Sequence, residues 1–126
     1  ALMGEMMLAY AEKRGLAGVV LNGAMRDYGY IRTRSFPVYA AGITHRGPYK
    51  NGPGEINVPV AFDGMVISPG GIMVGDDDGV VCVPLDHALA TVDAAEKKQS
   101  AERRQMEAIL EGTNDRSWVQ QAIANI

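Results

Sequence analysis

Apolar residues near the start of the chain alternate with polar ones at intervals typical of a helix and then of a strand. The apolar positions of the helix recur at helical spacing: Met6, Met7, Tyr10 and Ala11. Gly15 ends this helix. Residues 18–21 form a short run rich in β-branched side chains, which is typical of a strand buried on both faces. Asn22 and Gly23 then predict a tight turn.

Short apolar runs separated by turn signals fill the middle of the chain. They predict strands at residues 36–41, 56–62, 65–68, 72–75 and 79–84. Asp63-Gly64 is a strong hairpin signal, and residues 68–71 form another turn. The three aspartates at residues 76–78 invite a metal hypothesis. They lack the alternate ligand spacing and closing glutamate of a calcium loop, which favours an acidic hairpin turn.

A long helix is predicted over residues 85–111, with Asp86 near its start and Gly112 at its end. Its apolar residues gather at the two ends: Leu89, Val92, Met106, Ile109 and Leu110. Two pairs at helical spacing support its exposed face: Asp93 with Lys97, and Arg103 with Glu107. At about 40 Å this helix exceeds the needs of a small domain, so its middle is expected either to leave the body of the domain or to lie against a neighbour. A short helix within residues 114–126 follows, anchored by Trp118 and Ile123.

Composition and charge narrow the class of protein. A chain of 126 residues predicts one domain. The net charge of −3 argues against a nucleic-acid surface, and no apolar run is long enough to cross a membrane. The single cysteine, Cys82, lies in an apolar run and predicts a buried thiol in a reducing compartment. The cytoplasm is the simplest location.

Residues 4–27 also carry the best candidate for chemistry. The first helix would present free backbone N–H groups to an anion. The planar fork of donors on Arg26 suits a carboxylate or carbonyl oxygen, and Asp27 offers an oxygen ligand for a cation such as Mg²⁺. Glu5 returns to the same place if the helix and strand pack antiparallel. The alternative is a surface Arg-Asp pair beside a turn.

These residues resemble a known family. An acidic residue after glycine, twenty intervening residues and then Arg-Asp form the signature of class II 4-hydroxy-4-methyl-2-oxoglutarate aldolases and the related regulators of ribonuclease E activity. The segments FPVYAAGITHRGPYKNGPGEINVPV, GMVISPG and VGDDDGVVCVP resemble the later part of the family's sheet. The resemblance implies an α/β fold with layered β/β/α architecture of the swivelling-domain type and a long C-terminal helix. It also implies that a single domain over residues 1–126 lacks the family's N-terminal portion.

The resemblance further implies a metal-dependent lyase that forms pyruvate by retro-aldol cleavage, or decarboxylates oxaloacetate. Asp27 would bind Mg²⁺ or Mn²⁺, and Arg26 would stabilise the enolate. Backbone amides would hold the pyruvyl carboxylate, over the stretch Gly4, Glu5, Met6 and Met7. The subunits would form a trimer or a dimer of trimers, in which an acid on the long helix completes the neighbouring site. Glu102 matches that acid by spacing, with Glu96 as the second choice and a solvated charge as the alternative.

The sequence departs from the family's pattern at two positions, which leaves another function open. The family usually has an acid at each of them, where this chain has Tyr30 and Gly71. The loop at residues 44–55 supplies candidates for a second substrate carboxylate, namely His45, Arg46 and Lys50, unless it is simply solvated. The alternative function is a non-catalytic regulator that binds a ribonuclease E-like enzyme.

Overall fold

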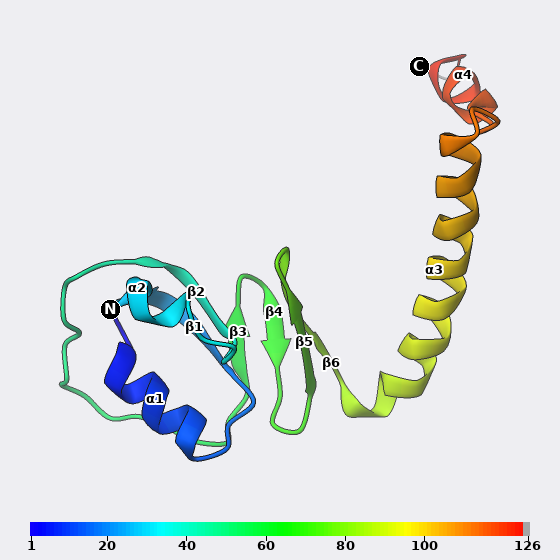
Figure 1. Ribbon diagram of the computed structural model, residues 1–126. Helices are drawn as coiled ribbons and strands as arrows, with labels where there is room; N and C mark the ends of the chain where they lie inside the picture. The colour runs from blue at the N-terminus through cyan, green and yellow to red at the C-terminus, as the bar shows by residue number, and fades with distance from the viewer. Residues whose placement is uncertain (125–126) are drawn as a thin grey trace. The chain divides into compact units, whose positions relative to one another are not determined.

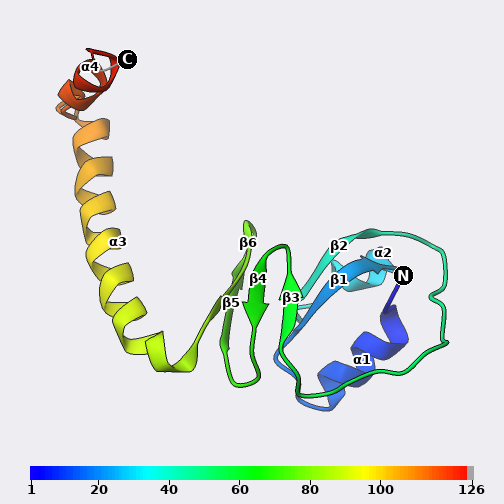
Figure 2. The same cartoon turned by 180° about the vertical axis from the view of Figure 1, so that it is seen from behind.

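The computed structural model describes residues 1–124, which belong to two compact units, Ala1–Cys82 and Val83–Ile126. We call them the N-terminal unit and the C-terminal unit. The N-terminal unit contains two helices and most of the strands (Figures 1 and 2). Its elements are α1 (Glu5–Lys13), β1 (Val19–Met25), α2 (Tyr28–Ile31), β2 (Val38–Ile43), β3 (Val60–Phe62), β4 (Met65–Ile67), β5 (Ile72–Asp76) and the start of β6 (Gly79–Val83).

The core of the N-terminal unit lies between the two helices and the parallel pair formed by β1 and β2. Its buried residues are Leu8, Ala11, Met25, Ile31 and Phe36. Partly buried side chains of both strands pack against them, including Leu21 and Val38. Met3, which precedes α1, forms a parallel bridge with Met25 of β1, the strand that follows the helix. The helix therefore crosses between two neighbouring parallel segments.

The first helix begins and ends as predicted, but it buries a different face. The N–H of Gly15 donates to the carbonyl of Glu12, and its φ of 80° is one that glycine adopts freely. The predicted anchors are largely solvent-exposed: Met6 by 83%, Tyr10 by 66% and Met7 by 55%. Leu8 is buried instead, together with the correctly predicted Ala11. The spacing of apolar residues identified the helix correctly, but it did not show that Leu8, and not Met6, Met7 or Tyr10, faces the core.

The predicted turn at Asn22 and Gly23 is wrong. Strand β1 continues through both residues, and its pairing with β2 shifts register between Leu21 and Ala24. Such a bulge accommodates an extra residue without ending the strand. A Cβ on Gly23 would lie 2.7 Å from the side chain of Leu2, so glycine here permits close packing as well. The strand is half-buried, where the sequence predicted burial on both faces.

The hairpins follow the turn signals. Strands β3 and β4 pair antiparallel around Asp63 and Gly64, whose φ angles are 46° and 82°. Strands β5 and β6 form a further two-stranded sheet, and the aspartates between them form a turn in which Asp76 accepts a bond from the N–H of Asp78. Cys82 is half-buried, where the sequence predicted burial, and its N–H donates to the Met65 sulfur at 3.2 Å.

The C-terminal unit is helical. It contains a short 3-10 turn, η1 (Leu85–His87), the long helix α3 (Ala88–Leu110) and the helix α4 (Ser117–Ala124). Gly112 follows α3 with a φ of 72°, as predicted, and α3 buries no side chain. In place of the predicted pairs, Lys98 contacts Glu102 at 3.1 Å and Arg103 donates to Gln99 at 3.0 Å. The last two residues of the predicted closing helix, 125–126, lie outside the described residues.

Candidate functional site

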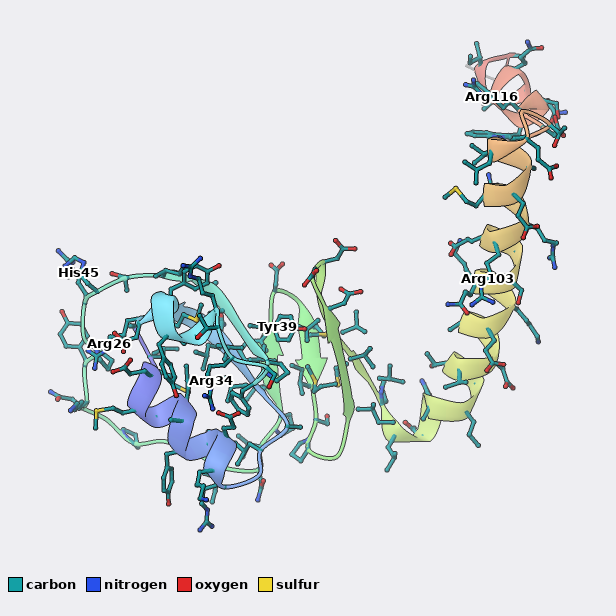
Figure 3. All side chains as sticks on the ribbon, viewed as in Figure 1. Arg26, Arg34, Tyr39, His45, Arg103 and Arg116 are labelled. Atoms are coloured by element: carbon teal, nitrogen blue, oxygen red, sulfur yellow. The ribbon has the colours of Figure 1, made fainter. Side chains whose placement is uncertain are left out.

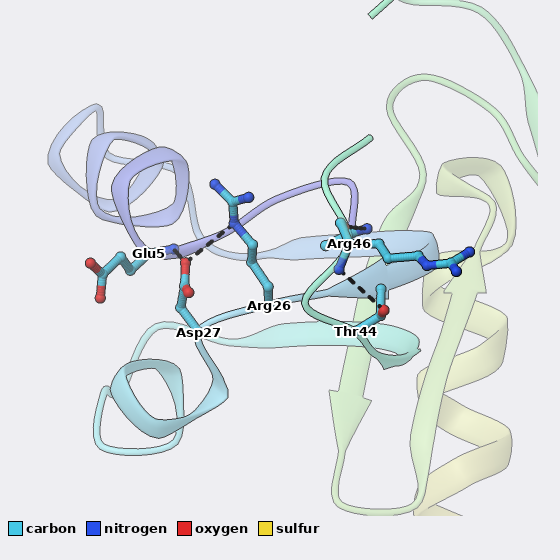
Figure 4. Close-up of polar contacts among 6 residues, drawn as sticks. Glu5, Arg26, Asp27, Thr44 and Arg46 are labelled. Atoms are coloured by element: carbon cyan, nitrogen blue, oxygen red, sulfur yellow. Dashed lines mark hydrogen bonds and ion pairs between the residues drawn. The ribbon is translucent and has the colours of Figure 1, made fainter. Parts of the chain in front are cut away.

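Arg26 and Asp27 follow directly after β1, at the end of the strand that meets the start of α1. Asp27 is in a left-handed conformation, with φ 61° and ψ 36°, and immediately precedes α2. Its Oδ2 accepts a hydrogen bond of 3.0 Å from the backbone N–H of Glu5 and lies 3.6 Å from Nε of Arg26 (Figure 4). The structure therefore brings the predicted trio together, through the backbone of Glu5.

Gly4 makes this close approach possible. The residue is buried and precedes the first residue of α1. A Cβ at this position would lie 2.5 Å from Oδ2 of Asp27 and 2.9 Å from Nε of Arg26. Any larger residue would therefore displace the carboxylate or the guanidinium. Glycine before Glu5 is thus a steric requirement of the Arg-Asp pair.

Helix α1 directs its N-terminal amides toward this pair, as the sequence predicted. Gly4 has no side chain to cap the helix, and the carboxylate of Asp27 takes that role for the N–H of Glu5. The first intrahelical bond runs from the N–H of Leu8 to the carbonyl of Gly4. The N–H groups of Met6 and Met7 therefore have no acceptor within the helix. They are the groups that remain to bind an anionic ligand.

The carboxylate of Glu5 lies apart from the other two side chains. In Figure 4 it points away from Arg26 and Asp27. Its backbone is fixed by the bond to Asp27, whereas its side chain is exposed. The sequence thus located this residue correctly but did not predict the orientation of its side chain.

A cavity of about 620 Å³ lies over these residues, within the range of small-molecule sites. Gly4, Glu5, Met6 and Met7 line it, together with Arg26 and Asp27. His45 and Lys50 contribute from the loop after β2, as does Pro48 (Figure 3 labels Arg26 and His45). Arg46, the third predicted cation of that loop, does not line the cavity, and its side chain points away from Asp27 in Figure 4. Thr44, which follows β2, also lines the cavity, although no sequence pattern indicated it.

Tyr30, which stands in place of the family's usual acid, belongs to a different cluster. The guanidinium of Arg34 lies 5.5 Å from the centre of the Tyr30 ring and donates to Glu12 at 2.8 Å. The hydrogen bond and charge of Glu12 raise the pKa of Arg34. These contacts connect α2 to α1, a role that sequence spacing did not reveal.

The predicted acids of the long helix lie in the C-terminal unit. Glu102 pairs with Lys98 on the exposed surface of α3. Glu96 is also exposed, beside Ser100 on the same helix. Neither residue lines the cavity of the N-terminal unit. Their assignment to a neighbouring subunit's site stays a prediction.

The donor set fits a hard divalent cation that keeps much of its water. Within residues 1–124, no three side chains of histidine, cysteine, aspartate or glutamate gather into a metal cluster. Mg²⁺ is commonly bound by one or two carboxylates, with water and substrate as the other ligands. The hydrogen bond and the ion pair of Asp27 both involve Oδ2, and its Oδ1 makes no hydrogen bond among the described residues. One carboxylate oxygen therefore remains for a cation.

A family model described as RraA-like, Aldolase/RraA, matches residues 1–82. The chain belongs to the RraA-like family. A relative from Halalkalibacterium halodurans, provisionally named a 4-hydroxy-4-methyl-2-oxoglutarate aldolase, is 37% identical over 109 residues, which are 86% of this chain and 52% of the relative. The predicted family is thereby confirmed.

Two crystal structures share the fold, which confirms the predicted α/β architecture. An uncharacterized protein from Pseudomonas syringae pv. tomato is 32% identical with a TM-score of 0.79, covering 89% of this chain and 56% of that one. Streptomyces coelicolor RraAS2, described as an unusual member of the RNase ES inhibitor RraA family, is 34% identical with a TM-score of 0.74, covering 85% and 56%. The chain thus spans about half the length of the relatives it matches. Within residues 1–124, no helix is long and apolar enough to cross a membrane.

Proposed function

We propose that this RraA-like chain is a divalent-metal-dependent lyase acting on small 2-oxo acids. The reaction is retro-aldol cleavage of substrates of the 4-hydroxy-4-methyl-2-oxoglutarate type to pyruvate, or decarboxylation of oxaloacetate. One observation carries the proposal: Asp27, Arg26 and the N-terminal amides of α1 meet at one cavity. The name of the H. halodurans relative supports the same class of reaction.

The residues of the site divide the work of binding. Asp27 would hold Mg²⁺ or Mn²⁺, which when bound supplies Lewis-acid polarisation of the 2-oxo group. The free amides of Met6 and Met7 would bind the pyruvyl carboxylate at the positive end of the helix dipole. Arg26 would donate to the 2-oxo oxygen as negative charge develops there. Glycine at position 4 leaves room for these groups to converge.

The bond changes follow from this arrangement. In the aldol cleavage, a base removes the proton of the C4 hydroxyl, the C3–C4 bond breaks, and its electron pair forms the enolate of pyruvate while C4 becomes a carbonyl. In the decarboxylation, the corresponding bond releases CO₂ and leaves the same enolate. Protonation at C3 then gives pyruvate. Glu5 lines the cavity as well as Asp27, and its carboxylate would relay the proton through water.

The test is pyruvate release by the purified protein supplied with Mg²⁺ or Mn²⁺. Replacing Asp27→Ala should abolish release and weaken Mn²⁺ binding measured by calorimetry. Asp77→Ala is the matched control, because Asp77 is an exposed carboxylate in the β5–β6 turn and should affect neither measurement. Failure of the unmodified protein to release pyruvate from either substrate would contradict the proposal.

A second function has its own support. The description of RraAS2 places that protein among RNase ES inhibitors, and Tyr30 of this chain packs against Arg34 where the family usually has an acid. A chain that regulates a ribonuclease E-like enzyme would form a stable complex with it and need no cation at Asp27. Capture by a ribonuclease E-like protein, undiminished in Asp27→Ala, would favour this function over the lyase.

We also propose that the chain works as a homo-oligomer, a trimer or a dimer of trimers, in the cytoplasm. Its long helix leaves Leu89 and Leu110 exposed by 84% and 80%. Large apolar side chains exposed on a helix are typical of a surface that another protein copy covers. In that assembly Glu102 of one copy would complete the site of the next.

A further inference from the structure

Asp27 has a left-handed backbone conformation, which is strained for a residue with a Cβ and persists only where the surroundings hold it. Its side chain is tied to α1 by the hydrogen bond of 3.0 Å from the N–H of Glu5. Its carbonyl accepts hydrogen bonds from the N–H groups of Tyr30 at 3.0 Å and Ile31 at 3.2 Å, so its backbone is fixed by the start of α2. The direction of the Asp27 carboxylate therefore depends on how α2 lies against α1.

Helix α2 is too short to hold its own position. It has four residues, and a single helical turn is not stable by itself in water. Ile31 anchors it in the buried core. Beyond its end, the guanidinium of Arg34 donates to Glu12 of α1 at 2.8 Å and lies 5.5 Å from the centre of the Tyr30 ring (Figure 3 labels Arg34). We call Glu12, Tyr30 and Arg34 the Arg34 cluster.

The Arg34 cluster packs closely on the core where α1 and α2 meet. The space left between the cluster and the core residues Leu8, Ile31 and Phe36 is only about 10 Å³. The ion pair itself remains partly open to solvent, since the side chains of Arg34 and Glu12 are 44% and 33% exposed. An ion pair this exposed contributes little to the stability of a whole domain. Its effect is instead expected locally, on the placement of α2.

We propose that Arg34 is a positioning residue, which fixes α2 against α1 through Glu12 and Tyr30 and so keeps the carboxylate of Asp27 at the first turn of α1. Arg34 does not line the cavity, so it acts on the site only through other residues. A guanidinium suits this role because its planar fork binds a carboxylate while its face lies over an aromatic ring. The consequence for a bound cation rests on the proposed function, in which Asp27 is the ligand.

The backbone amide of Glu5 reports where the Asp27 carboxylate lies, because the two groups are hydrogen-bonded. Nuclear magnetic resonance gives the chemical shift of this amide proton, and Asp27→Ala supplies its value when the bond is lost. Arg34→Met should move the Glu5 signal toward that value, and Glu12→Gln should move it in the same direction. The amide of Val19, which donates to the carbonyl of Pro37, should keep its chemical shift in both variants.

Calorimetry with Mn²⁺ alone measures the consequence at the site. Arg34→Met should weaken Mn²⁺ binding about fivefold, which is less than the loss expected on removing a direct partner of a metal ligand. The double variant Glu12→Gln, Arg34→Met should bind Mn²⁺ no more weakly than Arg34→Met, because the two residues act through one contact.

Arg32→Met is the matched control. It removes an arginine that directly follows α2 and makes no ion pair within residues 1–124. It should change neither the Glu5 signal nor the Mn²⁺ affinity. An unchanged Glu5 signal in Arg34→Met would overturn the proposal. An equal movement in Arg32→Met would also overturn it, because loss of positive charge near α2 would then suffice.

Turnover separates this inference from the proposed function. If Arg34→Met moves the Glu5 signal but the unmodified protein binds no Mn²⁺ and releases no pyruvate, the lyase proposal fails and the positioning role of Arg34 stands. If the unmodified protein is active and Arg34→Met matches it in Mn²⁺ affinity and in the Glu5 signal, the lyase proposal stands and the role of Arg34 fails. In an active protein, saturating Mn²⁺ should restore the kcat of Arg34→Met, and a loss that persists would contradict an action through Asp27.

Discussion

The beginning of the chain and its long helix use apolar residues in opposite ways. In the N-terminal unit, Leu8 retains 3% of its surface exposure, and Met25 and Ile31 each retain 7%. In the C-terminal unit, Leu89 is 84% exposed and Leu110 is 80% exposed, and α3 buries no side chain. The first region supplies its own core from two helices and two strands. The second has apolar residues at similar helical spacing, but no part of residues 83–124 buries them.

The difference indicates which region is stabilised by contacts within the chain and which is not. A helix with apolar residues on its surface is stabilised chiefly by packing, and an isolated one is marginal in water. The N-terminal unit can therefore hold Arg26 and Asp27 in place with its own contacts. Helix α3 buries no side chain of its own, and in our proposal another copy of the chain supplies the surface that covers it.

Subunit mixing tests this dependence, and it has the largest expected effect. Asp27→Ala and Glu102→Gln should each be nearly inactive alone, because each removes one half of a shared site. Mixed oligomers of the two should regain part of the activity, since some interfaces combine an intact Asp27 with an intact Glu102. Pyruvate release before and after the two variants are unfolded and refolded together measures the recovery.

The control for mixing pairs Asp27→Ala with Arg26→Ala. Both residues come from the same chain and lie 3.6 Å apart, so no interface can restore an intact pair. Recovery should therefore be absent. If Glu102→Gln alone kept full activity, the proposal of a site shared between two copies would be wrong. The long helix would then have no role in catalysis.

A pair of leucine replacements tests the comparison through stability. Leu8→Ala removes a buried side chain and should lower the free energy of unfolding by about 2–5 kcal/mol. Leu110→Ala removes a side chain that is 80% exposed in the single chain. At protein concentrations where the chain is dissociated, it should change that free energy by less than about 0.5 kcal/mol.

Urea unfolding, followed by circular dichroism, measures both variants. At higher concentration, Leu110→Ala should become destabilising if another copy covers α3, because unfolding is then linked to association. A large effect of Leu110→Ala in the dissociated chain would show that residues 83–124 have a core of their own, and the contrast would be wrong.

Sequence patterns predicted most elements of both regions but not what covers them. The glycine and Asp-Gly signals located the end of α1, the β3–β4 turn and the end of α3, because backbone conformations with positive φ depend on local sequence. The inner face of α1 was predicted wrongly, since Met6 and Leu8 are equally apolar and only the strands beneath decide between them. Asn22-Gly23 carried a turn signal that pairing with β2 overrode.

The candidate site shows the same division. The spacing from Glu5 to Asp27 predicted their proximity, and the hydrogen bond between them bears this out. Sequence did not predict that the bond uses the backbone of Glu5, or that Lys50 but not Arg46 lines the cavity. Both depend on the path of a long loop and on side-chain rotation, which local patterns do not encode.

The smallest expected effect concerns pH at the start of α4. The backbone N–H of Ser117 donates to Oδ1 of Asp115 at 2.8 Å, and its hydroxyl donates to Oδ2 at 3.0 Å. Both bonds, the backbone one foremost, lower the pKa of Asp115. A lowered pKa in the folded chain means that the carboxylate stabilises α4 above the ordinary aspartate range, and that this contribution disappears as the pH falls through the lowered pKa.

Trp118 provides the measurement, because it lies in the first turn of α4 and is 64% exposed. Its fluorescence should change between about pH 5 and pH 2 in the unmodified chain. In Asp115→Asn, which keeps an acceptor oxygen but does not titrate, that change should be absent. The unfolding midpoint of the N-terminal unit should not depend on this replacement, since its core involves no residue of α4. An identical pH profile in both proteins would mean that another group causes the change and that Asp115 does not stabilise the start of α4.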